Sequence, residues 1–291
     1  MNRNEFSARF SGGVHLLDGA TGSNLIRAGM PRGVCSEKWA LENPEALLKL
    51  QRDYVAAGSE ILYVPSFSAN RISLARHGLQ AEVGTINRGL AALSLRAAEG
   101  KALVAGDLTT TGIPLNPCDD AAYKALFDAY REQAQALLEG GVELFAVETM
   151  MGVAECMAAV EAIRAVSDLP VIVTLSLQAD GKCYFDGSGA EAAEAMQALG
   201  ADAVGVNCSV GPDQLASVIR TMHGACTLPI AAKPNAGMPS ISENGEAVYP
   251  MGAEDFARHM KTLAREGAVL LGGCCGTSPE YIAALRELKK V

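Results

Sequence analysis

Short apolar runs recur along the chain, and each is followed by a longer, Ala-rich stretch whose apolar residues have helical spacing. None of the short runs alternates cleanly between apolar and polar positions, which is typical of strands buried on both faces of a parallel sheet. Eight runs are therefore predicted to be strands, at residues 14–18, 61–64, 102–107, 144–148, 171–175, 203–207, 230–233 and 269–272.

The segments between these runs indicate helices, and Pro44 after Asn43 and Pro279 after Ser278 are helix-start signals. Eight strand-then-helix units without a Pro/Ser-rich linker predict an α/β fold, a single (β/α)8 TIM barrel forming one domain over residues 1–291. The alternative, a doubly wound sheet, usually has fewer strands, and no Gly-x-Gly-x-x-Gly motif follows a predicted strand. The predicted helices span residues 44–57, 83–99, 119–139, 152–165, 190–199, 214–222, 253–266 and 279–288.

Composition narrows the classes of partner. The 291 residues are 49% hydrophobic, enough for a large core, and 24 Lys and Arg against 33 Asp and Glu give a net charge of −9. Because nucleic acids and anionic membrane surfaces attract positive patches, neither is an expected partner. Residues 1–7 hold no apolar signal-peptide run, and no uncharged apolar run reaches the roughly 20 residues of a membrane helix, so a cytoplasmic location is expected.

The residues that end the apolar runs are polar, and barrel enzymes place their chemistry at the carboxyl ends of strands. Closure of the barrel would bring Cys208, after the sixth run, close to Cys274 and Cys275, after the eighth. Three thiolates favour zinc, and a site with three protein ligands leaves a position open for substrate. The polar strand ends are Asp18, Asp107, Glu148, Asn207-Cys208, Lys233 and Cys274-Cys275.

Neighbouring side chains on a strand point to opposite faces, so Cys274 and Cys275 can hold one ion only if the backbone bends there. The glycines within residues 272–276 supply that freedom. A strained disulfide between Cys274 and Cys275 is the alternative, and it leaves Cys208 unexplained. Of the remaining cysteines at 35, 118, 156, 183 and 226, those at 156, 183 and 226 are expected to be small core residues.

Four motifs make the chain resemble a known family. Residues 16–23 (Leu-Leu-Asp-Gly-Ala-Thr-Gly-Ser), 205–208 (Gly-Val-Asn-Cys), 234–237 (Pro-Asn-Ala-Gly) and 272–277 (Gly-Gly-Cys-Cys-Gly-Thr) resemble, in order and spacing, the homocysteine S-methyltransferase family. The likeness is greatest to the homocysteine-binding barrel at the N-terminus of cobalamin-dependent methionine synthase. It runs from about Leu16 to the C-terminus.

The resemblance implies one zinc ion per chain, held by Cys208, Cys274 and Cys275, with the sulfur of homocysteine as the fourth ligand. The implied reaction moves a methyl group to that sulfur and gives methionine. The sequence has no Asp-x-His-x-x-Gly corrinoid segment, so a methylcorrinoid donor such as methylcobalamin is expected on a separate corrinoid protein.

The resemblance also implies the contacts of the amino acid substrate. Asp18 and Glu148 are expected to bind its amino group, and backbone amides around Gly22 and Ser23 its carboxylate. Asp18 could instead cap a turn. Asn235 is a further candidate, which either supports the site or only shapes the turn after the preceding proline.

Three loops depart from the family pattern. Residues 64–70 (Val-Pro-Ser-Phe-Ser-Ala-Asn) stand where the family tends to have Thr-Asn-Thr-Phe, and residues 106–112 (Gly-Asp-Leu-Thr-Thr-Thr-Gly) where it often has Gly-Ser-Ile-Gly-Pro-Thr. Gly152 replaces the acid of a Glu-Thr-x-x-Asp motif. These loops face the donor and the far end of the thiol, so a different thiol acceptor or a small sulfonium or betaine-like donor is an alternative.

Two further readings come from other classes. Lys233 ends a predicted barrel strand, where a desolvated lysine could form a Schiff base with a carbonyl substrate in a lyase. That reading leaves the three cysteines unexplained. A non-catalytic zinc or thiol carrier would use the cysteines but yield no methylated product.

Overall fold

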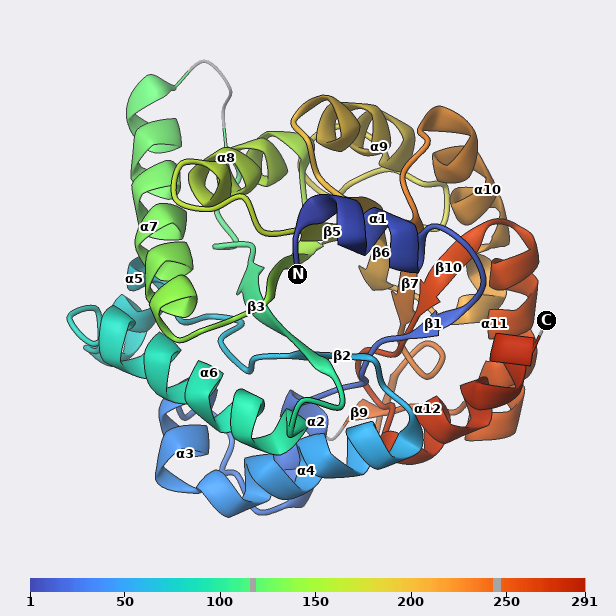
Figure 1. The fold of residues 1–291 in the computed structure, drawn as a ribbon, viewed down its shortest axis with the longest axis horizontal. Coiled ribbons are helices and arrows are strands. Elements are labelled where there is room, and N and C mark those ends of the chain that lie inside the picture. The colour runs from blue at the N-terminus through green and yellow to red at the C-terminus, as the bar shows by residue number, and fades with distance from the viewer. Residues whose placement is uncertain (116–118, 243–246, 291) are drawn as a thin grey trace.

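The computed structural model describes residues 1–115, 119–242 and 247–290, so Cys118 lies outside the described residues. Eight parallel strands form one sheet, and a parallel bridge between Leu17 and Ile61 joins its first strand to its second. The TIM barrel predicted from the sequence is thereby confirmed (Figure 1). In spatial order the strands are β1 (His15–Leu16), β10 (Ala268–Leu271), β7 (Ile230–Pro234), β6 (Ala203–Cys208), β5 (Val171–Leu175), β4 (Leu144–Met150), β3 (Leu103–Thr109) and β2 (Ile61–Tyr63).

The predicted helices surround the strands, with ends that differ from the prediction by a few residues at most (Figure 1). In the first of them, Leu47, Leu48, Gln51 and Tyr54 follow helical spacing and are all buried against the barrel. The helices are α4 (Pro44–Ala57), α6 (Val83–Ala98), α7 (Asp120–Glu139), α8 (Val153–Arg164), α9 (Gly189–Ala198), α10 (Ala216–Ala225), α11 (Ala253–Arg265) and α12 (Pro279–Leu285).

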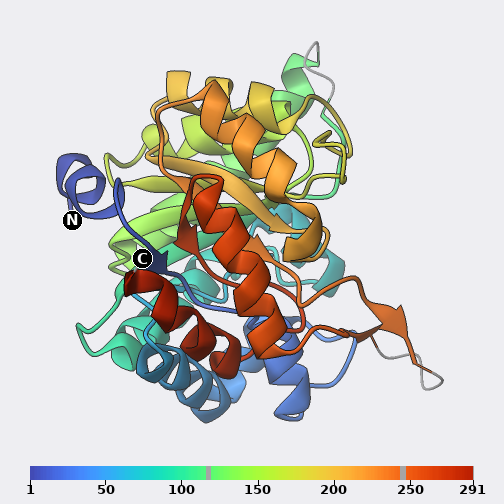
Figure 2. The ribbon, with the colours of Figure 1, turned by 90° about the vertical axis from the view of Figure 1, so that its right-hand side faces the viewer.

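Several short elements were not predicted. They are the helices α1 (Arg3–Phe10), α2 (Gly22–Arg27), α3 (Ser36–Glu42) and α5 (Arg71–Leu74), the 3-10 helices Ala75–His77 and Pro212–Gln214, and the strands β8 (Ser240–Ile241) and β9 (Ala247–Val248). The last part of the predicted helix 279–288 belongs to the 3-10 helix Arg286–Lys290. The antiparallel pair β8 and β9, in orange in Figure 2, projects from the body of the molecule.

Helix α1 lies across the amino-terminal opening of the barrel (Figure 1). Asn2 and Glu5 form a reciprocal capping box at its start, which satisfies two backbone amides. Phe6 and Phe10 are spaced one turn apart, are fully buried, and pack with the inward residues of the strands. The bottom of the barrel is therefore a closed apolar core.

Inward positions change character along the strands. Ala105, Ala146 and Ala231 belong to the apolar cluster inside the barrel. Side chains alternate between the faces of a strand, so the next inward positions lie two residues further on. They are Asp107, Glu148 and Lys233, all buried. The polar residues consequently gather at the carboxyl ends of the strands.

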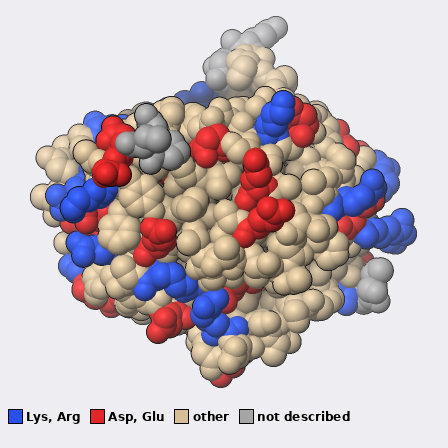
Figure 3. Space-filling model, turned by 90° about the horizontal axis from the view of Figure 1, so that it is seen from above, with Lys and Arg blue, Asp and Glu red and all other residues tan. Residues whose placement is uncertain are grey.

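On the face shown in Figure 3, Lys and Arg side chains are interspersed with Asp and Glu. None of the helices in the described ranges combines the length and the apolar character needed to cross a membrane.

Candidate active site

Three cysteines meet at the carboxyl ends of the strands. The sulfur atoms of Cys208, Cys274 and Cys275 all lie within 4.8 Å of one another, and the side chains are half-buried. Strands β6 and β10 both pair with β7, which explains why residues so far apart in sequence converge. A tetrahedral site with zinc–sulfur bonds of about 2.3 Å has sulfurs about 3.8 Å apart, so these cysteines fit zinc.

The end of β7 positions the paired cysteines. The Cys274 amide donates to the Pro234 carbonyl at 2.8 Å, and the Ala236 amide donates to the Cys275 carbonyl at 3.0 Å. The Thr277 hydroxyl donates to the Cys274 carbonyl at 2.8 Å. Both cysteines lie beyond the end of β10, which allows them to face the same site, as predicted.

Gly276 completes this turn. Its φ of +86° is a left-handed conformation that favours glycine, and a Cβ atom there would lie 2.3 Å from the Tyr249 ring. Tyr249 hydrogen-bonds to Cys275. Hydrogen bonds from Cys208, Cys274 and Tyr249 lower the pKa of the Cys275 thiol well below its ordinary value. Tyr249 was not among the predicted site residues.

Cys208 is presented by a strained backbone. Cys208 and Ser209 have φ angles of 57° and 58°, which for residues other than glycine cost of order 1–3 kcal/mol each. The Ser209 hydroxyl accepts a hydrogen bond from the Leu177 amide at 2.7 Å. The Asn207 side chain exchanges two hydrogen bonds of 2.7 Å with Thr149. Contacts with neighbouring strands therefore hold the thiol in place.

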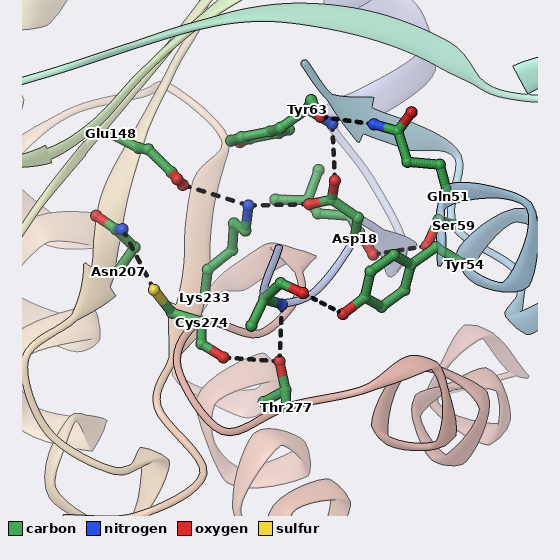
Figure 4. A network of polar contacts seen from close by, with 12 residues as sticks. Asp18, Gln51, Tyr54, Ser59, Tyr63, Glu148, Asn207, Lys233, Cys274 and Thr277 are labelled. Carbon is green, nitrogen blue, oxygen red and sulfur yellow. Dashed lines mark hydrogen bonds and ion pairs between the residues drawn. The ribbon is translucent and has the colours of Figure 1, made fainter. Parts of the chain in front are cut away.

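A buried lysine lies beside the cysteines. The Lys233 ammonium contacts Asp18 Oδ1 at 3.0 Å and Glu148 Oε2 at 3.3 Å, and it lies 3.4 Å from the centre of the Tyr63 ring. Figure 4 shows Lys233 between the two carboxylates, with Asn207 and Cys274 on the neighbouring side. The other oxygen of Asp18 accepts from the Tyr63 amide at 2.7 Å.

These contacts decide the charge of Lys233. Burial opposes its positive charge, but Asp18 and Glu148 raise its pKa well above the ordinary value. Burial raises the pKa of both carboxyls, and Lys233 acts in the opposite direction. A Schiff-base lysine needs a lowered pKa to be a neutral nucleophile, so the surroundings of Lys233 do not suit the lyase reading.

A cavity of about 240 Å³ joins the cysteines to this ion-paired cluster. The predicted substrate-binding residues Asp18, Glu148, Gly22 and Ser23 line it, together with Lys233, Asp107, Tyr63 and the three cysteines. The Ser23 hydroxyl is buried and has no hydrogen-bond partner among the described residues. The residues around the cavity thus combine thiols, carboxylates, an ammonium group and a short Gly-Ser segment.

Asn235 has a different place. Within the described chain it is not one of the residues that line the cavity, and its side-chain amide donates to the Ser209 carbonyl at 3.3 Å. It therefore braces the loop after Cys208. Asp107 is a polar strand end in the sequence but was not a predicted site residue, because its inward register with Ala105 becomes visible only in the fold.

Comparisons with known proteins indicate the family of this chain. The family model for homocysteine S-methyltransferase matches residues 15–288. Methionine synthase from Mycobacterium leprae is 29% identical over 287 residues, which cover 92% of this chain and 24% of that protein. Methionine synthase from Mycobacterium tuberculosis is 28% identical over 299 residues, which cover 95% of this chain and 25% of that protein. The chain spans about a quarter of the length of these curated relatives.

Solved structures share the fold. The metallated form of the homocysteine methyltransferase MmuM from Escherichia coli has a TM-score of 0.80 at 24% identity, covering 95% of this chain and 96% of that one. Its oxidized form has a TM-score of 0.81 at 23% identity and covers 99% of both chains. Since the family model also matches nearly the whole sequence, the chain belongs to the homocysteine S-methyltransferase family.

Proposed function

We propose that this protein transfers a methyl group to the thiolate of homocysteine and releases methionine. The observation that carries the proposal is the convergence of Cys208, Cys274 and Cys275 on a cavity that also holds buried carboxylates. The thiols would hold one zinc ion. Zinc bound by three thiolates lowers the pKa of a further coordinating thiol while leaving its sulfur electron-rich and nucleophilic.

The chain's own residues bind and orient the amino acid. The cavity carries the negative charge that an ammonium group requires, on the buried acids Asp18, Asp107 and Glu148. The unpaired Ser23 hydroxyl and the backbone amides around Gly22 supply donors for a carboxylate, since the first amides of a helix have no acceptor within it. With the thiol held at the cysteines, methyl transfer needs an electrophilic methyl group in line with the sulfur, and positioning lowers the barrier.

We propose a methylcorrinoid, carried by a corrinoid protein, as the methyl donor. The matched relatives are methionine synthases about four times as long as this chain. A sulfonium or betaine-like donor would need an aromatic surface for its positive charge. Tyr63 is an aromatic residue of the cavity, and the Lys233 ammonium already covers its ring. Phe67 is then the one other aromatic residue that lines the cavity in the described chain, and a single ring favours the methyl group of a corrinoid over a cationic donor.

A methyl-transfer assay on the zinc-loaded protein tests the reaction. Homocysteine is incubated with deuteromethyl-labelled methylcobalamin, S-methylmethionine or glycine betaine in parallel, and labelled methionine is measured by mass spectrometry. We expect product from methylcobalamin with the wild type and with Cys226→Ser, but none with Cys275→Ser. Cys226 is half-buried at the end of α10, so it is a matched control for the loss of a thiol. Absence of labelled product from every donor would contradict the proposal.

A further inference from the structure

The place expected for the substrate ammonium group is already filled by the protein. Lys233 contacts both Asp18 and Glu148, at 3.0 and 3.3 Å. Both oxygens of Asp18 are engaged, one by Lys233 and the other by the Tyr63 amide. Lys233 is only 2% exposed and is sealed on one side by the Tyr63 ring. A substrate ammonium group would have to displace a buried ion pair to reach these two acids.

A third acid of the cavity is not paired with a cation in this way. Asp107 lies near the end of β3, lines the cavity, and is 3% exposed. Its Oδ1 atom is buried and accepts no hydrogen bond from any residue in the described ranges. A buried carboxylate oxygen without a hydrogen-bond donor is costly, because it has lost its water without gaining a partner.

The charges around the cavity also do not balance. Three buried carboxyls, Asp18, Asp107 and Glu148, surround one lysine. Burial and the adjacent Glu148, to which Asp107 hydrogen-bonds, raise the pKa of Asp107 well above its ordinary value. A cation placed against Asp107 would oppose this rise, because an adjacent opposite charge favours the ionised carboxylate.

We propose that the Asp107 carboxylate receives the ammonium group of the thiol substrate, while Lys233 fixes Asp18 and Glu148 as a preformed wall of the cavity. This assignment rests on the proposed function, because it places an amino acid thiol in the cavity. It makes Asp107 a specificity residue, which distinguishes an amino acid from a thiol acid of the same length.

Two ligands that differ only in the amino group test the assignment. They are L-homocysteine and 4-mercaptobutanoate, titrated into the cobalt-substituted protein while the sulfur-to-cobalt charge-transfer band is followed. We expect the wild type to bind homocysteine more tightly, and Asp107→Asn to lose that preference by about 10- to 100-fold, the range for a hydrogen bond between charged groups. Binding of 4-mercaptobutanoate should change little in Asp107→Asn.

Thr174→Val is the matched control. Thr174 lies on β5 and is 1% exposed, and its hydroxyl has no hydrogen-bond partner in the described part of the chain. The Thr174→Val variant should keep the wild-type preference for homocysteine. A preference that survives in Asp107→Asn, or that falls equally for both ligands, would overturn the assignment but leave thiol binding intact. If neither thiol perturbs the cobalt band of the wild type, the proposed function fails and the assignment fails with it.

Discussion

The two ends of the barrel are built on the same strands but contain opposite chemistry. At the amino-terminal end, Phe6 and Phe10 of α1 seal an apolar core that includes Ala105 and Ala231. Two residues further along the strands, the inward positions carry Asp107 and Lys233. A step of two residues along the same strands therefore separates a region that stabilises the fold from a region that tolerates buried charge and backbone strain.

The largest effect should come from removing a thiol at the polar end. Cys275→Ser should lose zinc and lower methyl transfer by more than about 100-fold, beyond the 10- to 100-fold typical of groups outside the metal ligands. Zinc content and initial rates measure this, with Cys226→Ser as the control. Because the thiol is half-buried, the metal-free variant and metal-free wild type should unfold at similar urea concentrations. Full zinc occupancy in Cys275→Ser would contradict the site.

A substitution at the apolar end should lower stability and leave activity nearly unchanged. Phe10→Ala removes a fully buried ring and should lower the free energy of unfolding by about 3–5 kcal/mol. Its kcat/KM should stay near the wild-type value at temperatures where the variant is folded. Urea unfolding and steady-state kinetics measure the two quantities, and Ile241→Ala, at a side chain 73% exposed, is the surface control. Equal losses of stability and of kcat/KM would remove the separation between the two ends.

Replacing Lys233 tests whether the stability of the polar end depends on the ion pairs with Asp18 and Glu148. Lys233→Met leaves Asp18 and Glu148 without their cation and should cost about 3 kcal/mol of unfolding free energy, the lower end of the range for a broken buried pair. We expect the lower end of the range because Asp18 still accepts the hydrogen bond from the Tyr63 amide. Lys182→Met, at an exposed lysine, should change stability by less than about 0.5 kcal/mol. A stabilised Lys233→Met variant would show that the cluster is not held together by charge.

The smallest effect concerns the pH dependence of the amino-terminal end. Burial alone would raise the pKa of Glu60, but hydrogen bonds from His15 and Lys289 lower it to about 2. A lowered folded-state pKa stabilises the protein above the unfolded-state pKa near 4.3, and that stability is lost as pH falls toward 2. Glu60→Gln should remove about 1 kcal/mol of this acid-sensitive stability, since solvent screens part of it. Urea titrations at pH 6 and pH 3 measure the difference, and an unchanged pH slope would contradict it.

Much of the barrel could be predicted because its elements carry strong patterns. Each predicted strand is buried, and helices such as Pro44–Ala57 have both a start signal and an apolar face. Helix α1 escaped prediction because its eight residues bury only Phe6 and Phe10, too few to show a period. The short helices α2 and α3 have the same limitation.

The candidate site likewise contains some residues that could be predicted from the sequence and others that could not. Cys208, Cys274 and Cys275 could be selected from the sequence because strand order fixes which strand ends are close, and thiols there have few structural roles. The engagement of Asp18 by Lys233 could not be predicted, because it depends on side-chain reach across the barrel. Asp107 needed the inward register of β3, which only the fold supplies.

Zinc-edge X-ray absorption of the zinc-loaded wild type, with and without homocysteine, tests the central claim most directly. We predict three sulfur ligands from the protein and a fourth sulfur when homocysteine is added. The first three come from Cys208, Cys274 and Cys275. Fewer than three sulfurs, or a zinc environment that homocysteine leaves unchanged, would contradict the account.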